Sequence, residues 1–425
     1  EDDNPLRTLF NKLVEDSTGG IQTEETEMKI LTMCFTVAYL EKLRVANRFL
    51  VDAVLSDLSG LSDNNSLILD AQALQHLEIF EATSTSSQVG SEGSFFSYFD
   101  RTTTPFGRRK LQSWVSCPLK SVKEINARLE MVDDLNEISV IRDQFHKSIK
   151  KLPDLERKIS HLLATSVYTT PNQRLWTSMY SKRIPTLYNL LQSFRTFTKP
   201  LSTLQRSKDY FTSTRLKQLI TSQSDQITHR AKGLLPDLSS ILHEFDSLVN
   251  WEISSKDAHA IPIPVLNRCP EFDKAQAAIN KVISQLQGHL KSIKRQFKNS
   301  HEVTFVKSKY RYEIEVPLVL VKNNPKLVEK LELTSIRKGY QRFHSDEIKR
   351  LLTKLVALEQ ERDQALTPFL AILLRKFAEN RDNWRQAIDC MAELDCVCSL
   401  SLVATTEEGM CRPVLFDGVG GFSLR

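Results

Sequence analysis

The residues best suited to a chemical task are basic and amide side chains gathered in one part of the chain. Between Lys291 and Arg342 there are thirteen basic residues against five acidic ones, a net charge of +8, whereas residues 1–30 carry a net charge of −5. Long cationic side chains and amides suit phosphate oxygens, which they bind without reading base sequence. We therefore expect contacts to a nucleic-acid backbone from Lys307, Lys309, Arg311, Lys322, Asn323, Asn324, Arg337, Lys338 and Arg342. The alternative is that these cations only protect exposed strand edges from aggregation.

Other kinds of site lack the residues that they need. No glycine is followed by lysine, so the chain has no phosphate loop for a nucleotide. The seven cysteines form no Cys-x-x-Cys pair and the nine histidines no His-Glu-x-x-His motif, so we interpret the cysteines as reduced, mostly buried thiols. We expect no catalytic residue, metal site or cofactor site within this chain.

Two long helices are expected to carry the basic segment. Apolar residues recur in two interleaved seven-residue series from Phe272 to Phe297. A second apolar stripe runs from Asp346 to about Asn380, and Pro368 is expected to kink it. Between these helices, alternating residues predict one hairpin around Lys307-Ser308-Lys309, with a second strand from Tyr310 to Val316, and another hairpin that turns at Gly339.

Capping residues define further helices. Thr104 and Pro105 are typical of a helix start, and Pro118 should stop that helix. A second amphipathic helix follows from Val122, and Asp154 is expected to cap a later one. The fold class is therefore mainly α: a core of many helices, with two long antiparallel stem helices that carry a small antiparallel β tip.

Three further segments have patterns of their own. Residues 27–58 predict one continuous helix, and residues 174–231 predict two helices around Lys199-Pro200. The stretch from Ser255 to Pro270 contains three prolines and is expected to be a rigid connector rather than a regular element.

Several short motifs follow one another in an order that is specific to one family. They are Ile68-Leu69-Asp70, Leu77-Glu78-Ile79, Phe99-Asp100-Arg101-Thr102, Thr104-Pro105-Phe106-Gly107, Leu111-Gln112-Ser113-Trp114, Pro118-Leu119 and Arg128-Leu129. This ordered set resembles the core (lever) domain of the MutS family of DNA mismatch-repair proteins. The later Cys411-Arg412-Pro413-Val414 resembles the exit from that domain.

The resemblance implies a division into domains. Residues 1–65 would be the C-terminal part of a connector domain, and residues 66–270 the first part of the lever. Residues 271–380 would be the stem helices and DNA clamp, with the β tip at about 302–343. Residues 381–425 would return along the lever toward an ATPase domain that this chain lacks.

The resemblance also implies a function and partners. The clamp would hold duplex DNA by its backbone, and the stems would link that grip to the ATPase domain of the full-length protein, which uses ATP and Mg. Within the family the chain is most similar to the eukaryotic MutS homologue Six type, which recognises base mismatches and small loops in the nucleus as a heterodimer with MutS homologue Two. Alternatives are another MutS paralogue acting in large-loop repair or meiotic recombination, or a helical scaffold that does not bind DNA.

One motif of the family is interpreted differently here. The family's mismatch reader uses a Phe-x-Glu motif, and the only such spacing in this chain is Phe377-Ala378-Glu379. It lies late in the second stem, far from the N-terminal position of a reader. We interpret it as coincidence.

Overall fold

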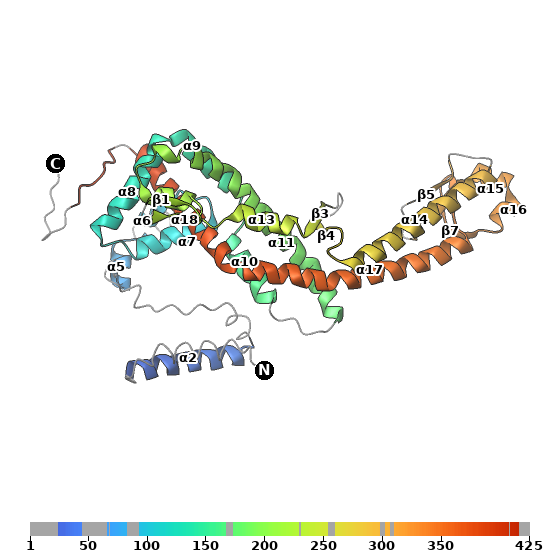
Figure 1. Cartoon of the computed structure of the whole chain (residues 1–425), viewed down its shortest axis with the longest axis horizontal. Coiled ribbons are helices and arrows are strands. Elements are labelled where there is room, and N and C mark those ends of the chain that lie inside the picture. Colours follow the sequence, from blue (N-terminus) through green and yellow to red (C-terminus); the bar gives the residue numbers. More distant parts are fainter. Residues whose placement is uncertain are drawn as a thin grey trace. The chain divides into compact units, whose positions relative to one another are not determined.

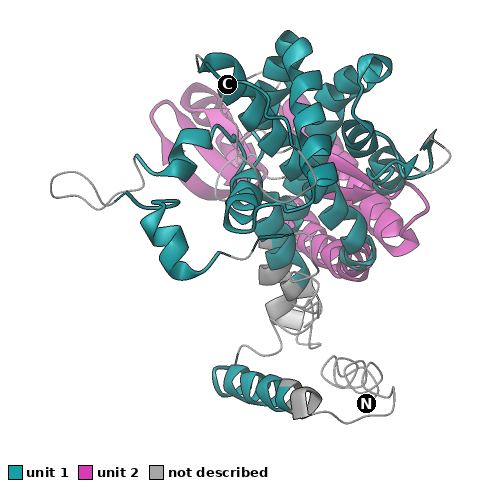
Figure 2. Ribbon diagram, turned by 90° about the vertical axis from the view of Figure 1, so that its left-hand side faces the viewer, with its two compact units in different colours: residues 1–245, 374–425 teal, residues 246–373 magenta. Residues whose placement is uncertain are grey.

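The structure is a computed structural model that describes residues 24–44, 66–67, 69–82, 93–166, 173–228, 231–253, 260–297, 302–306, 310–407 and 409–415. The chain forms two compact units, coloured separately in Figure 2: Glu1–Phe245 with Leu374–Arg425, and Asp246–Leu373. The second unit begins before the expected stem domain, since it includes a β-hairpin that precedes the first stem. The expected domain boundaries remain predictions.

The first unit is mainly helical, as the sequence predicts. Its helices are α2 (Glu24–Lys42), α5 (Ala71–His76), α6 (Phe95–Phe99), α7 (Pro105–Ser116), α8 (Val122–Glu137), α9 (Ser139–Ile149), α10 (Leu155–Ser166), α11 (Gln173–Arg206), α12 (Thr214–Ile220), α13 (Leu238–Asp246) and α18 (Arg381–Thr406). A short 3-10 turn, η1 (Lys208–Tyr210), and two strands, β1 (Gln226–Thr228) and β2 (Ala231–Lys232), complete the unit.

Helix α7 begins and ends where the sequence predicts. Thr104 has an extended backbone, and its Oγ1 accepts the Gly107 amide at 3.0 Å. Pro105 occupies the first helical position, where no amide hydrogen is needed. Helix α18 packs along both α7 and α8, so a helix from the end of the sequence packs between helices from its first third.

Three predicted elements outside the β tip are corrected by the structure. The predicted helix 27–58 ends at Lys42, and residues 45–65 lie outside the described part of the chain. Helix α11 continues through both Pro185 and Pro200 instead of dividing at Lys199-Pro200. A proline disfavours helical backbone before it but does not forbid it where packing supports the helix, and Phe194, Phe197 and Leu201 of α11 are buried.

The predicted connector 255–270 is the third correction. Strand β3 (Val249–Ile253) pairs with β4 (Ala260–Pro264), with Trp251 opposite Pro262 and Val249 opposite Pro264. Prolines at alternate positions point the same way, so both ring nitrogens can face away from the partner strand. A two-stranded hairpin therefore tolerates them.

The second unit contains both predicted stem helices, α14 (Pro270–Gln296) and α17 (Asp346–Glu379), the latter ending in the first unit. Pro368 lies inside α17, which is one unbroken helix. One apolar core joins the stems to a face of a small sheet: Ile279, Val282, Leu286 and Ile293 from α14, Ile348, Leu351 and Leu355 from α17, and Ile314, Val316 and Phe343 from the strands. Among the described residues, no helix is long and apolar enough to cross a membrane.

Both predicted hairpins are present. The strands β5 (Thr304–Val306), β6 (Glu313–Pro317), β7 (Glu332–Arg337) and β8 (Tyr340–His344) form an antiparallel sheet in the order β5-β6-β8-β7. Two short helices, α15 (Leu318–Asn323) and α16 (Pro325–Val328), connect β6 to β7 at the same end of the stems (Figure 1). The turn before β8 uses Gly339 at φ +88°, a conformation that L side chains rarely adopt.

The predicted strand 310–316 begins three residues late. Arg311 and Tyr312 have φ values of 36° and 53°, so the alternation of faces expected there is interrupted, and β6 begins at Glu313. Glu313, the first residue of β6, is fully buried.

Candidate functional site

The end of the second unit formed by α15, α16 and the β7–β8 turn is rich in exposed cations. The main-chain amide of Leu318 donates to the carbonyl oxygen of Gly339 at 3.1 Å, which brings the start of α15 against the turn. Three of the predicted phosphate contacts, Lys322, Arg337 and Lys338, are exposed here. Asn323 is exposed next to Lys322, whereas the Asn324 side chain donates to the Leu320 carbonyl oxygen at 3.1 Å.

Sequence reasoning missed two more cations of the same surface. Lys326 in α16 and Lys330 beyond it are exposed, so residues 318–340 hold five cations against two acids, Glu329 and Glu332. Glu332 is paired with Lys349. Within the described part of the chain, none of the five cations makes an ion pair. We call Lys322, Lys326, Lys330, Arg337 and Lys338 the tip cations.

Arg311 is placed differently from the tip cations. Its guanidinium donates two hydrogen bonds to Glu359 of α17, at 2.8 Å and 2.7 Å to the two carboxylate oxygens. This pairing raises the pKa of Arg311 and lowers the pKa of Glu359. Arg311 therefore reaches the stem helix. Local sequence patterns could not predict this contact, because the two residues are 48 positions apart.

Arg342 lies away from the surface, contrary to the exposed contact expected from the sequence. It is 7 % exposed, and its Nε donates to Glu315 Oε2 at 2.8 Å, with Glu313 3.8 Å away. A buried cation must be paired, and these two acids supply the pairing. Arg342 belongs to the interior of the sheet, and we leave it out of the candidate surface. Lys307 and Lys309 lie outside the described residues.

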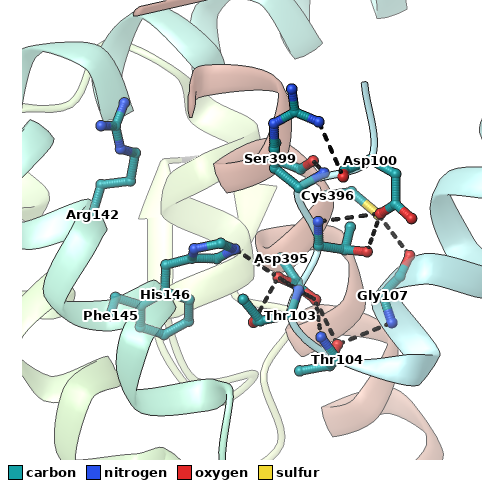
Figure 3. Close-up of polar contacts among 12 residues, drawn as sticks. Asp100, Thr103, Thr104, Gly107, Arg142, Phe145, His146, Asp395, Cys396 and Ser399 are labelled. Atoms are coloured by element: carbon teal, nitrogen blue, oxygen red, sulfur yellow. Dashed lines mark hydrogen bonds and ion pairs between the residues drawn. The ribbon is translucent and has the colours of Figure 1, made fainter. Parts of the chain in front are cut away.

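A second polar site lies inside the first unit, around Asp395 of α18 (Figure 3). This carboxylate is fully buried and accepts the Thr104 amide at 2.9 Å, the Thr104 hydroxyl at 2.6 Å and the Thr103 amide at 3.2 Å. His146 of α9 places its Nε2 3.3 Å from Oδ1 of Asp395, close enough for charge attraction if the ring is protonated. Asp395 and Thr104 are buried and their polar atoms meet partners within the protein, so this cluster holds α7, α9 and α18 together.

The close approach of α7 to α18 depends on Gly107. A Cβ atom at this position would lie 2.2 Å from Asp395 Oδ2, a distance that real side chains do not allow. The Gly107 carbonyl oxygen also accepts a hydrogen bond from the Cys396 thiol at 3.2 Å. The Thr-Pro-Phe-Gly motif therefore combines a helix start with a helix contact.

The contact between α7 and α18 lies within a segment that matches a known protein family. MutS domain III matches residues 72–401, well over half of the 425-residue chain. The chain belongs to the MutS family. The predicted family and the mainly α fold with a small β tip are thereby confirmed.

Individual MutS relatives agree with this assignment. The chain is 28 % identical over 94 % of its length to the DNA mismatch repair protein Msh6 of Gallus gallus, and 28 % identical over 94 % to that of Homo sapiens. It is 26 % identical over 91 % of its length to the human DNA mismatch repair protein Msh3. It covers 31 %, 30 % and 31 % of these three relatives, so it spans about a third of their length.

The Phe-x-Glu spacing does not act as a mismatch reader at its position in this MutS chain. Phe377 is fully buried, and its ring stacks on Trp384 with centroids 5.1 Å apart. A ring enclosed in this way cannot stack on a base. Among the described residues, no group of three or more His, Cys, Asp or Glu side chains could hold a metal ion.

Proposed function

We propose that this chain grips duplex DNA by its phosphate backbone through the tip cations, as part of a DNA mismatch-repair subunit. The observation that carries the proposal is the concentration of unpaired cations at the tip, which contrasts with the paired Arg311 and the buried Arg342. Phosphates spaced along a duplex attract such side chains without regard to sequence. The relatives named as DNA mismatch repair proteins support the choice of DNA as the polyanion.

In the whole protein we propose that the tip acts as a clamp and that the stems link it to an ATPase domain that binds ATP and Mg. The substrate would be nuclear DNA with a base mismatch or small loop, and the partner MutS homologue Two. The Msh6 relatives support this version. The similarity to human Msh3 supports a second candidate, another MutS paralogue that acts in large-loop repair.

The test is duplex binding by the chain over a series of salt concentrations. We expect log affinity to fall linearly with log salt, and a Lys322→Glu, Arg337→Glu, Lys338→Glu variant to bind weakly with a slope smaller by about 2 to 3. The matched control reverses three exposed lysines of the first unit, Lys120, Lys123 and Lys151, and should keep most of the affinity. Equal weakening in both variants, or none in either, contradicts a clamp at the tip. Absence of duplex binding by the unchanged chain at every salt concentration favours the scaffold alternative.

A further inference from the structure

The two residues that precede β6 have an unusual backbone conformation. Arg311 and Tyr312 are consecutive non-glycine residues with positive φ, at 36° and 53°. Side chains with a Cβ disfavour this region, so the conformation persists only where the surroundings hold it in place.

Three contacts hold this segment. Glu359 of α17 binds the Arg311 guanidinium through both carboxylate oxygens, at 2.7 Å and 2.8 Å. The Arg311 carbonyl oxygen lies 3.1 Å from His344 Nε2, which must donate because a carbonyl has no proton. The Tyr312 ring packs edge-on against Phe305 of β5, with centroids 5.4 Å apart. Arg311 is therefore fixed at its backbone by the sheet and at its side chain by the stem helix.

The same segment leads directly to the tip cations. Strand β6 pairs with β8 from Ile314 opposite Phe343 to Pro317 opposite Tyr340, so the direction of β6 sets that of β8. At its other end β6 runs into α15, whose first amide is bonded to Gly339 in the β7–β8 turn. A continuous path of pairings thus connects Arg311 with Lys322, Arg337 and Lys338.

We propose that Glu359 is a positioning residue for DNA binding, which orients the tip cations on the stem by holding Arg311. The inference rests on the proposed function, because it assigns a role within that DNA contact. Glu359 does not touch DNA itself: besides the apolar core, it is a polar contact through which the stem helix holds the start of β6. A change in the stem would reach the bound duplex through this contact.

The chemistry of the pair suits orientation better than stability. The Arg311 side chain is 47 % exposed and the Glu359 side chain 26 %, and ion pairs so open to water add little to the free energy of folding. Two parallel hydrogen bonds between a planar guanidinium and a carboxylate nevertheless fix the direction of both groups. The hydrogen bonds from Arg311 lower the pKa of Glu359, so the pair stays charged to a lower pH than an unpaired glutamate would.

The experiment compares duplex binding by the 425-residue chain and its Glu359→Gln variant across a salt series. Removing an acid from a DNA-binding protein should ordinarily strengthen binding. We expect the opposite here: Glu359→Gln weakens the affinity about three- to tenfold, because the tip cations lose their alignment. Glu361→Gln is the matched control, since Glu361 is exposed on the same helix and this substitution removes the same charge. It should bind as tightly as the unchanged chain or more tightly.

A charge exchange separates positioning from loss of fold. The double variant Arg311→Glu, Glu359→Arg should regain most of the affinity lost in Glu359→Gln, with circular dichroism unchanged in every variant. Stronger binding by Glu359→Gln, with a salt slope larger by about one, would instead make Arg311 a direct phosphate ligand. That result, or no rescue by the exchange, overturns the inference while leaving the effect of the tip cations intact.

Discussion

At the scale of single residues, the buried polar groups of α18 explain how the first unit is held together. Each one meets a partner from another helix or loop. Glu393 receives two hydrogen bonds from Arg215, Ser399 accepts the Arg101 amide, and Ser401 donates to Asn136. Buried polar groups without partners would cost free energy, so these contacts select one arrangement of the helices.

Gly107→Ala tests the closest of these approaches. The added methyl group would collide with Asp395 Oδ2 and Thr104 Oγ1, so we expect the free energy of unfolding to fall by roughly 2 to 4 kcal/mol. Urea unfolding measures it. The control is Gly288→Ala, where nothing lies within 4 Å of the new Cβ, and a small gain of up to about 1 kcal/mol is expected. Equal effects at the two glycines would contradict the contact.

The cysteines provide a second test at this scale. They were expected to be mostly buried, but only Cys390, Cys396 and Cys398 are, whereas Cys34, Cys117 and Cys411 are exposed. Burial raises the pKa of Cys390 to about 12, and also raises the pKa values of Cys396 and Cys398. Because the thiolate is the reactive form, iodoacetamide should label the three exposed cysteines of the native chain and spare the buried ones. Mass spectrometry locates the labels, and rapid labelling of Cys396 would count against the buried junction.

At the scale of elements, helix α10 is tied to α7 through its own cap. Asp154 Oδ1 accepts the Arg157 amide at 3.3 Å, which confirms the predicted cap. The Asp154 carboxylate also binds the Arg109 guanidinium of α7 at 2.7 Å and 2.9 Å. This arginine lowers the pKa of Asp154 below its ordinary value of 3.8.

The lowered pKa predicts how stability depends on pH. A carboxylate whose pKa is lower in the folded than in the unfolded state contributes stability above the unfolded value, and this is lost as the pH falls through the folded value. Asp154→Asn keeps the capping oxygen but not the charge, so we expect it to cost about 1 kcal/mol at neutral pH and nothing in strong acid. Urea unfolding at several pH values measures the difference. The exposed Asp209→Asn serves as control, and a loss of the same size at every pH would rule out the charge as its cause.

At the scale of the whole molecule, each unit has a core of its own. The second unit encloses Leu286 of α14. This side chain is fully buried, in the same apolar core as Leu351 and Leu355 of α17. The first unit encloses the aromatic rings of Phe194, Phe377 and Trp384. Separate cores allow one unit to lose stability while the other keeps its structure.

Leu286→Ala tests this separation. Removing buried methyl groups should lower the stability of the second unit by about 2 to 5 kcal/mol. We expect faster amide hydrogen exchange in α14 and the sheet, and unchanged protection in α7, α8 and α18. Val356→Ala, at a position of α17 that is 44 % exposed, should change little. Faster exchange spread evenly over both units would show that they unfold as one.

Local patterns in the sequence determined much of the fold and the family. Thr104 and Pro105 start α7, the seven-residue series in α14 and the apolar stripe of α17 define the stems, and Gly339 marks a hairpin, because capping, periodicity and turn chemistry act between near neighbours. The same reasoning failed at Pro200 and at the β3–β4 hairpin, where packing and strand pairing outweigh the local preference of proline.

Which cations are available at the tip was decided by the tertiary structure alone. Arg311, Arg337 and Arg342 are equivalent as residue types, and their spacing does not distinguish them. Arg311 is paired with Glu359, whereas Arg337 is exposed. Arg342 is paired with Glu315 inside the sheet. Charge pairing depends on the distance between two groups in the fold, because the interaction energy weakens as that distance grows. This distance bears no fixed relation to separation along the chain.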